Sequence, residues 1–285
     1  MASLMNSSLS LVDSARSCPI GVFDSGVGGL TVVRAMRDLL PTEDIFYIGD
    51  TARLPYGTKD QTTIERYSQE ICGLLLAERA KVIVVACNTA SALALPRLHE
   101  TLRVPVIGVI APGARAAAKA SHNGKIGVLA TPSTAQSGAY ERAIHALRPD
   151  AKVFSQAAPL LVPLIEEGWL ADPVTREVLT RYLEPVLRAE IDTLVLGCTH
   201  YPLLRPLLQE LTPGIQLVDS AQNCAVAVTQ LLNELVLGTD GQTDGLLNVA
   251  LTDSSNPFLG TARDALRLRI DHLERRTVQG VAMVA

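Results

Sequence analysis

Two short apolar runs, each ending on a cysteine, constrain this chain more than any other feature. Residues 193–196 form one run, and the sequence Gly197-Cys198-Thr199-His200 follows it directly. Residues 82–86 form the other run, which is followed by Cys87-Asn88-Thr89. Apolar runs of this length, rich in β-branched residues, are typical of parallel strands that are buried on both faces. The sequence therefore predicts two thiols, each at the carboxyl end of a buried strand.

Strand and helix patterns alternate along the whole chain. In the first half, stretches with helical spacing of apolar residues separate four short apolar runs, at residues 20–23, 44–48, 81–86 and 104–109. In the second half, the corresponding runs are residues 126–129, 153–155, 193–196 and 216–218. Helices are predicted between the runs, among them one at residues 91–102 and one at residues 133–147. This alternation is typical of doubly wound α/β folds with a mainly parallel sheet. Because the two cysteine motifs also align, we predict two similar α/β domains with the active site in the cleft between them.

The domain boundaries are placed where the alternation starts again. Pro112-Gly113 is the candidate hinge, since proline and glycine together interrupt regular structure. The first domain is expected to comprise residues 18–111 and 221–285, and the second domain residues 112–220.

Both ends of the chain are expected to lie outside this core. Residues 1–17 are rich in serine and lack the basic start and apolar stretch of a signal peptide, so we expect a disordered tail. Residues 239–285 follow a polar, turn-rich connection and are interpreted as an appendage to the first domain. Within them, the pattern predicts a strand at residues 247–251 and a helix at residues 261–273.

Composition and charge exclude several classes of function. The chain has 285 residues and a net charge of -4, which argues against a basic surface for nucleic acid. No uncharged apolar run approaches the roughly 20 residues that span a membrane. The five cysteines are odd in number and widely spread, which favours reduced thiols in a cytoplasm over a disulfide framework. We therefore expect a small-molecule substrate, with neither nucleic acid nor membrane as a partner.

A glycine-rich loop, Asp24-Ser25-Gly26-Val27-Gly28-Gly29, follows the first predicted strand. Its backbone N–H groups and the helix start behind it could hold an anion. The glycine spacing matches neither a dinucleotide motif nor a P-loop, and Asp24 would repel a phosphate. A ligand with a carboxylate fits this loop better than a nucleotide does. A tight turn without any ligand is the alternative.

Two thiols at matching strand ends suit one reaction. Ligands of open α/β sheets bind outside the carboxyl ends of the strands. Each cysteine also precedes a predicted helix, whose start lowers a thiol pKa below its usual value of about 8.5. Inverting a carbon centre requires a proton to leave one face and another to arrive at the opposite face, which two opposed groups achieve directly. The residues alone thus predict a thiol-based epimerase of a small carboxylate, whose candidate carboxylate donors are Ser25, Asn88, Thr89 and Thr199.

Other interpretations of the cysteines stay open at this point. Each cysteine could be an inert packed residue. Cys87, Cys198 and His200 could bind a metal ion, although no Cys-x-x-Cys or His-x-x-x-His spacing accompanies them. The two thiols could form a redox disulfide, yet redox catalysts usually place both sulfurs in one short loop. His200 next to Cys198 is the candidate group that sets the protonation of that thiol.

Four motifs resemble, in order and spacing, those of bacterial glutamate racemases. They are residues 23–30, Asp50 with Pro55-Tyr56-Gly57, residues 87–90 and residues 197–202. The resemblance implies a racemase that needs no cofactor, neither pyridoxal phosphate nor a metal ion. It also implies that the product, D-glutamate, serves peptidoglycan synthesis in the bacterial cytoplasm.

The resemblance also implies roles for single residues. Cys87 and Cys198 would be the acid–base pair, with Cys87 acting on D-glutamate and Cys198 on L-glutamate. Asp24 would assist the first cysteine. The positions that match the substrate-contacting residues of the family are Asp24, Ser25, Tyr56, Gly57, Asn88, Thr89, Thr199 and His200.

The second cysteine would be assisted by His200 and by an acidic residue. By position that acid is Glu166, with the adjacent Glu167 as the alternative. The oligomeric state stays open, with a homodimer as one option. Racemisation of aspartate or another small acid, and amino-acid binding without catalysis, are the competing functions. Some members of the family bind DNA gyrase, but no feature of this sequence points to that property.

Overall fold

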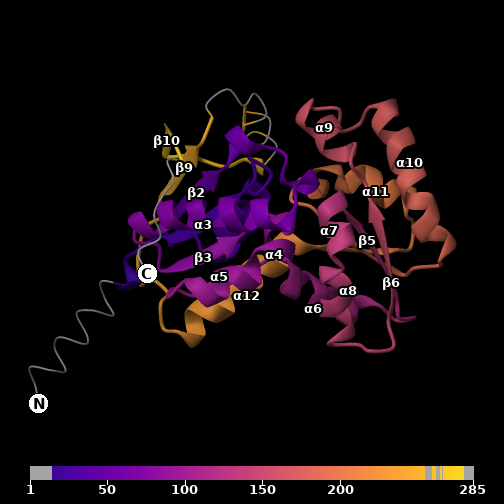
Figure 1. The fold of residues 1–285 in the computed structure, drawn as a ribbon, viewed down its shortest axis with the longest axis horizontal. Coiled ribbons are helices and arrows are strands. Elements are labelled where there is room, and N and C mark those ends of the chain that lie inside the picture. The colour runs from indigo at the N-terminus through magenta and orange to yellow at the C-terminus, as the bar shows by residue number, and fades with distance from the viewer. Residues whose placement is uncertain (1–14, 254–258, 261–263, 265, 279–285) are drawn as a thin grey trace, which may run out of the picture.

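The computed structural model describes residues 15–253, 259–260, 264 and 266–278, and it has two parallel sheets (Figure 1). The first sheet has six strands in the order β10-β9-β2-β1-β3-β4. Its strands are β1 (Ile20–Asp24), β2 (Ile45–Gly49), β3 (Val82–Val85), β4 (Val106–Gly108), β9 (Leu247–Leu251) and β10 (His272–Arg275). Every strand pair in this sheet is parallel, as the sequence predicts.

Helices cover both faces of the first sheet. One face packs against α3 (Gln61–Ala77), α4 (Asn88–Leu93) and α5 (Leu95–Thr101). The other face packs against α2 (Leu30–Leu39) and α12 (Ser220–Glu234). Burial on both faces explains why these strands are apolar throughout and do not alternate with polar residues.

The second sheet has four strands in the order β6-β5-β7-β8, again all parallel. Its strands are β5 (Lys125–Ala130), β6 (Lys152–Ala157), β7 (Thr193–Gly197) and β8 (Gln216–Asp219). The helices around it are α6 (Ile110–Ala120), α7 (Pro132–Ser137), α8 (Ala139–His145), α9 (Leu161–Glu166), α10 (Pro173–Arg188) and α11 (Arg205–Leu211). In Figure 1 this unit lies to the right of the first sheet.

The four core strands of the two sheets have the same order. Strands β2-β1-β3-β4 of the first sheet correspond to β6-β5-β7-β8 of the second. Cys87 follows β3 and Cys198 follows β7, so each thiol stands at the end of the third strand in its set. The predicted fold class and the predicted matching strand ends are therefore confirmed.

The two units are joined by direct packing. Helix α12 packs against α2, on one face of the first sheet, and also against α6 of the second unit. The hydroxyl of Thr31, at the start of α2, donates a hydrogen bond of 3.0 Å to the backbone oxygen of Thr199. This bond connects the helix behind the glycine loop to the Cys198 motif.

Pro112 and Gly113, the candidate hinge, lie in the first turn of α6, where a proline is tolerated because its missing N–H would be unpaired anyway. The hinge itself stays a prediction. Two other local predictions are wrong. The predicted helix at residues 91–102 is divided at Ala94 into α4 and α5. The predicted helix at residues 133–147 is divided at Gly138, whose φ of 63° lies in the left-handed region.

The C-terminal region is part of the first sheet. Strand β9 lies between β2 and β10, and its residues Leu247, Val249 and Ala250 are fully buried, so the interpretation of residues 239–285 as an appendage is wrong for this strand. The predicted strand at residues 247–251 is confirmed. Residues 261–263 and 265 of the predicted helix lie outside the described residues, but its end is strand β10, where Leu273 is exposed.

The first part of the predicted N-terminal tail, residues 1–14, lies outside the described residues. Arg16 is described, and its guanidinium donates hydrogen bonds of 2.7 Å to the Gly238 oxygen and 2.6 Å to the Asp240 carboxylate. Defined structure thus begins before residue 18. In the part of the chain that the structure describes, none of the helices has the length and apolar character needed to cross a bilayer.

Candidate active site

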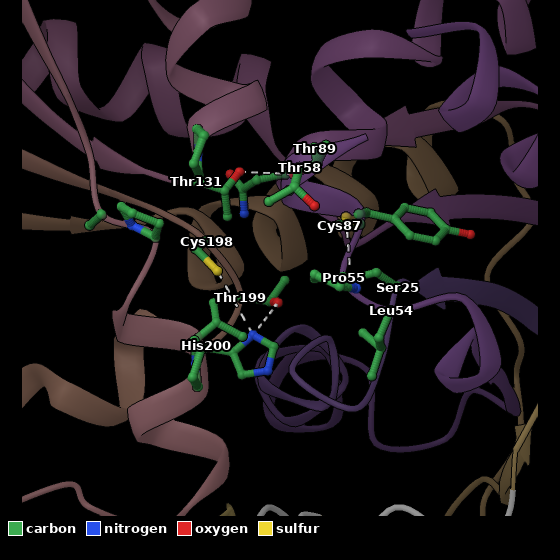
Figure 2. A pocket seen from close by; sticks show the side chains of 18 of the residues that line it. Ser25, Leu54, Pro55, Thr58, Cys87, Thr89, Thr131, Cys198, Thr199 and His200 are labelled. Atoms are coloured by element: carbon green, nitrogen blue, oxygen red, sulfur yellow. Dashed lines mark hydrogen bonds between the residues drawn. The ribbon is translucent and has the colours of Figure 1, made fainter. Parts of the chain in front are cut away.

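The carboxyl ends of the two sheets enclose a cavity of about 310 Å³, a volume that suits a small ligand. All of the predicted site residues except Asp24 line it. Figure 2 shows Cys198 and His200 on one side of this cavity and Cys87 on the other. The two thiols, 111 positions apart in the sequence, thus share one small space, and both are almost completely buried.

Cys87 is buried beside a hydroxyl group and a buried carboxyl group. Cys87 caps the N-terminus of α4, where its sulfur accepts a hydrogen bond of 3.4 Å from the Ala90 N–H, and it lies 3.8 Å from the Ser25 hydroxyl. Burial, reinforced by the negative charge of Asp24, raises the pKa of the Cys87 thiol to about 12. The expectation that the helix start lowers this pKa is therefore wrong, because desolvation outweighs a single N–H donor.

Asp24 lies beneath the cavity wall and does not reach the cavity. Its Oδ2 accepts hydrogen bonds from the N–H groups of Gly26 (3.2 Å) and Gly29 (2.9 Å), which fold the glycine loop around the carboxyl group. Burial raises the pKa of Asp24, although the positive charge of His200 and these N–H donors act in the opposite direction. Its second oxygen has no hydrogen-bond partner among the described residues.

On the Cys198 side, the thiol, an imidazole ring and a carboxylate contact one another in series. The sulfur of Cys198 lies 3.8 Å from Nδ1 of His200, and Nε2 of the same ring lies 3.3 Å from Oε1 of Glu166. Burial alone would lower the pKa of His200, but its hydrogen bonds with Cys198 and Glu166 raise it to about 10. At neutral pH the ring is therefore an imidazolium that can donate to both neighbours.

The structure distinguishes the two candidate acids. Glu166 ends helix α9, and its Oε1 contacts Nε2 of His200, whereas Glu167 follows the helix and lines the cavity. This geometry supports Glu166 as the assisting acid. Cys198 is followed by a short 3-10 helix, Tyr201–Leu204, so the predicted α-helix start at the thiol is absent.

Asn88 and Thr89, in the first turn of α4, contact hydroxyl groups from α7, α8 and the residue before α7. Oδ1 of Asn88 accepts a hydrogen bond of 2.7 Å from the Tyr140 hydroxyl, while its buried Nδ2 has no partner among the described residues. The Thr89 hydroxyl lies 3.0 Å from that of Thr131 and 3.1 Å from that of Thr134. The Asn88 amide group thus offers an unused donor at the cavity wall.

Thr131 is a cavity residue that the sequence reasoning missed. It follows β5 directly and caps α7, so it stands at the same edge of the second sheet as Cys198. The rule that ligands bind at the carboxyl ends of parallel strands would have found it, had the rule been applied to every strand. Its neighbour Pro132 also lines the cavity.

Tyr56 and Gly57 form the wall between the units. The Tyr56 hydroxyl donates a hydrogen bond to the Asp50 carboxylate, so its ring borders the cavity while its polar end points into the protein. A Cβ atom added to Gly57 would lie 2.7 Å from Cβ of Thr131, which explains the need for glycine. The Ser133 hydroxyl donates to the Gly57 oxygen at 2.8 Å and joins the two units here.

The alternative of a metal site finds no support in the side chains. Among the residues that the structure describes, no three His, Cys, Asp or Glu side chains are grouped as ligands for a metal ion.

The raised pKa of His200 predicts how stability depends on pH. An unperturbed imidazole has a pKa of about 6.5, so the proton on His200 stabilises the folded state fully below about pH 6.5, and this contribution is lost as the pH rises to about 10. Urea unfolding of the wild type and of His200→Gln between pH 6 and pH 10 measures it. We expect the stability difference between them to shrink across this window; a constant difference would contradict the raised pKa. Buried thiols with raised pKa, such as Cys87, lower stability at high pH in both proteins and cancel in the comparison.

A second prediction concerns the carboxylate that supports the imidazolium. Glu166→Gln removes the negative partner of Nε2 and should lower the pKa of His200 from about 10 toward its usual value. Glu167→Gln is the matched control and should leave that pKa unchanged. NMR titration of ¹⁵N-labelled imidazoles, with the His200 signals assigned by their loss in His200→Gln, measures both. Equal shifts in the two variants would assign no special role to Glu166.

Known proteins resemble this chain over most of its length. Residues 20–231 match the model of the Asp/Glu/Hydantoin racemase family. A glutamate racemase of Neisseria meningitidis serogroup C is 51% identical over 243 residues, which cover 85% of this chain and 86% of the relative. A glutamate racemase of Syntrophus aciditrophicus is 54% identical over 215 residues, covering 75% and 80% of the two chains.

Solved structures of glutamate racemases have a similar fold. The glutamate racemase of Thermus thermophilus in complex with beta-chloro-D-alanine has a TM-score of 0.84 at 42% identity, covering 93% of this chain and 99% of that one. The glutamate racemase of Francisella tularensis in complex with D-glutamate has a TM-score of 0.87 at 35% identity, with the same coverage.

Proposed function

This chain belongs to the Asp/Glu/Hydantoin racemase family, and we propose that it is a glutamate racemase in which Cys87 and Cys198 exchange protons with opposite faces of the substrate. Its activity is the interconversion of L- and D-glutamate, and its D-glutamate serves peptidoglycan synthesis. The single observation that carries the proposal for the two cysteines is their position on opposite sides of one small cavity, at corresponding strand ends.

The two sides of the cavity support different protonation states. The imidazolium of His200 lies 3.8 Å from the Cys198 sulfur and can stabilise negative charge that develops on it, whereas the raised pKa of Cys87 keeps that residue a neutral thiol. This pair is ready for one direction of the reaction, because one sulfur can accept a proton while the other can give one. From the family resemblance, Cys198 acts on L-glutamate.

In that direction the Cys198 thiolate removes the proton from Cα of L-glutamate. The C–H bond breaks, an S–H bond forms, and the electron pair moves into the α-carboxylate. The Cys87 thiol then donates its proton to the opposite face of Cα and gives D-glutamate. The protonation states of the two sulfurs are now exchanged, so the enzyme is ready for the reverse reaction. Donors at the cavity wall stabilise the charge that develops on the carboxylate; Asn88 and Thr199, which line the cavity, are the candidates.

Isotope exchange tests the proposed activity. L-Glutamate is incubated in D₂O with protein that has been treated with a chelator and freed of cofactors. We expect D-glutamate to form with deuterium at Cα, since the proton that is delivered comes from a thiol in exchange with solvent. L-Aspartate under the same conditions tests the competing substrate. Binding of glutamate without inversion or deuterium incorporation would instead identify a non-catalytic amino-acid binder.

The domain division proposed from the sequence has support in the two sheets. All strands of the second sheet lie between residues 125 and 219, and those of the first sheet lie before and after this segment. A homodimer and a cytoplasmic location are proposals that rest on the family resemblance and on the scattered cysteines; sedimentation velocity measures the first and cell fractionation the second.

A further inference from the structure

The hydroxyl group of Tyr140 reaches across the boundary between the two units. Tyr140 belongs to α8, beside the second sheet, and its hydroxyl donates the 2.7 Å hydrogen bond to Oδ1 of Asn88 on α4 of the first unit. Both side chains are about 2% exposed. Tyr140 does not line the cavity, whereas Asn88 does. The tyrosine is therefore in contact with a cavity residue without reaching the ligand space itself.

Two glycines leave room for the Tyr140 ring. A Cβ atom added to Gly197, at the end of β7, would lie 3.2 Å from the ring, and one added to Gly113, in α6, would lie 3.4 Å from it. The ring is thus packed tightly between these backbone segments, and its hydroxyl has little freedom to move. Burial also raises the pKa of Tyr140 well above its usual value, so the hydroxyl keeps its proton and can donate it.

A tyrosine hydroxyl can donate or accept, and in this structure it donates to Oδ1 of the Asn88 amide. Oδ1 is occupied by the tyrosine hydroxyl, so Nδ2 is the end that stays available. Nδ2 is buried and has no partner among the described residues, and a buried N–H group without a partner is unfavourable until a ligand oxygen accepts its hydrogen bond. With the amide reversed, Oδ1 would meet a carboxylate oxygen, and two acceptors repel each other.

We propose that Tyr140 is a positioning residue that fixes the amide of Asn88 with its NH₂ group toward a carboxylate of the substrate. The inference rests on the proposed racemase function, since it takes the ligand to be an amino acid. Because Nδ2 can only donate, Tyr140 favours a carboxylate over the ammonium group at this point of the cavity. It thereby helps to decide which way round the amino acid binds.

The Tyr140→Phe variant tests this proposal because it removes only the hydroxyl. We expect KM for both enantiomers to rise about ten-fold, the effect of losing about one hydrogen bond, while kcat stays within about two-fold. Tyr182→Phe on α10 is the matched control, because Tyr182 is half-buried and does not line the cavity, and it should leave KM unchanged. Thermal unfolding of both variants checks that the fold is intact.

A double-mutant cycle separates positioning from a general structural effect. If Tyr140 acts only through the amide, Tyr140→Phe should not change KM further when it is added to Asn88→Ala. Asn88→Asp should bind substrate at least as weakly as Asn88→Ala, because it can accept from Tyr140 but presents an acceptor, not a donor, to a carboxylate. A Tyr140→Phe effect that is equally large in the Asn88→Ala background would overturn the proposal.

The outcomes also separate this inference from the proposed function. An unchanged KM in Tyr140→Phe, with normal racemisation in the wild type, refutes the positioning role alone. If the wild type does not racemise glutamate, the proposed function fails. The calorimetric Kd of D-glutamate for the same variants then decides on Tyr140, with a ten-fold weakening expected and equal Kd values against it.

Discussion

Replacing Cys87 or Cys198 by serine should each reduce racemisation by at least about a thousand-fold in both directions. A serine hydroxyl is a far weaker acid than a thiol, and a positioned acid–base group contributes up to about 10⁴-fold to the rate. Losing either sulfur interrupts the same path, because one proton must leave and another must arrive. Circular dichroism of glutamate measures the rate from each enantiomer.

The remaining thiol should still exchange a proton on its own face. In D₂O, Cys87→Ser should incorporate deuterium into L-glutamate without inversion if Cys198 acts on that enantiomer, and Cys198→Ser should do so with D-glutamate. Cys18→Ser is the control, since Cys18 is half-buried and does not line the cavity. Normal turnover in Cys198→Ser would exclude the two-base mechanism.

A single methyl group at Gly28 should reduce kcat by about a hundred-fold. A Cβ atom at this position would lie 2.5 Å from the His200 ring and 2.6 Å from the Thr199 hydroxyl, closer than any stable contact. The chain must respond by moving His200, and displacement of a catalytic group by about 1 Å costs about two orders of magnitude in rate. Position 28 of the glycine loop thus requires glycine, because any side chain there would clash with His200 and Thr199 of the second unit.

Kinetics and imidazole titration together test the Gly28→Ala prediction. The pKa of His200 should fall below about 10 in this variant, because its hydrogen bonds with Cys198 and Glu166 lengthen. Gly238→Ala is the control, since the nearest described atom to a Cβ atom there, Oε1 of Glu43, lies 4.0 Å away. A Gly28→Ala enzyme with normal kcat and an unshifted pKa would show that the loop can yield without moving the histidine.

The sequence predicted the parts of this fold that depend on local pattern. Buried parallel strands produce uninterrupted apolar runs, so the order of residues alone was enough to locate β3 and β7 and the thiols at their ends. The division of one predicted helix at Gly138 could not be foreseen, because helical spacing of apolar residues continues across it. Strand β10 is short and exposed at the sheet edge, so no apolar pattern marks it.

The sequence predicted which residues form the site better than it predicted their pKa values and contacts. The raised pKa of Cys87 depends on neighbours from distant segments that exclude water, and no property of the Cys87 motif itself encodes them. Tyr140 was missed for a related reason, since it acts through Asn88 and carries no motif of its own. Burial and contacts between units are properties of the whole fold, and spacing along the chain does not report them.

The shared strand order of the two sheets places two thiols in equivalent positions with unlike neighbours. The enantiomers of glutamate have equal free energies in water, so the equilibrium constant of racemisation is unity by mirror symmetry. Detailed balance then requires the same kcat/KM for both enantiomers, in the wild type and in every variant. The chemical difference between the two sides can appear only as a trade between kcat and KM, so that the enantiomer with the lower KM is also the one turned over more slowly.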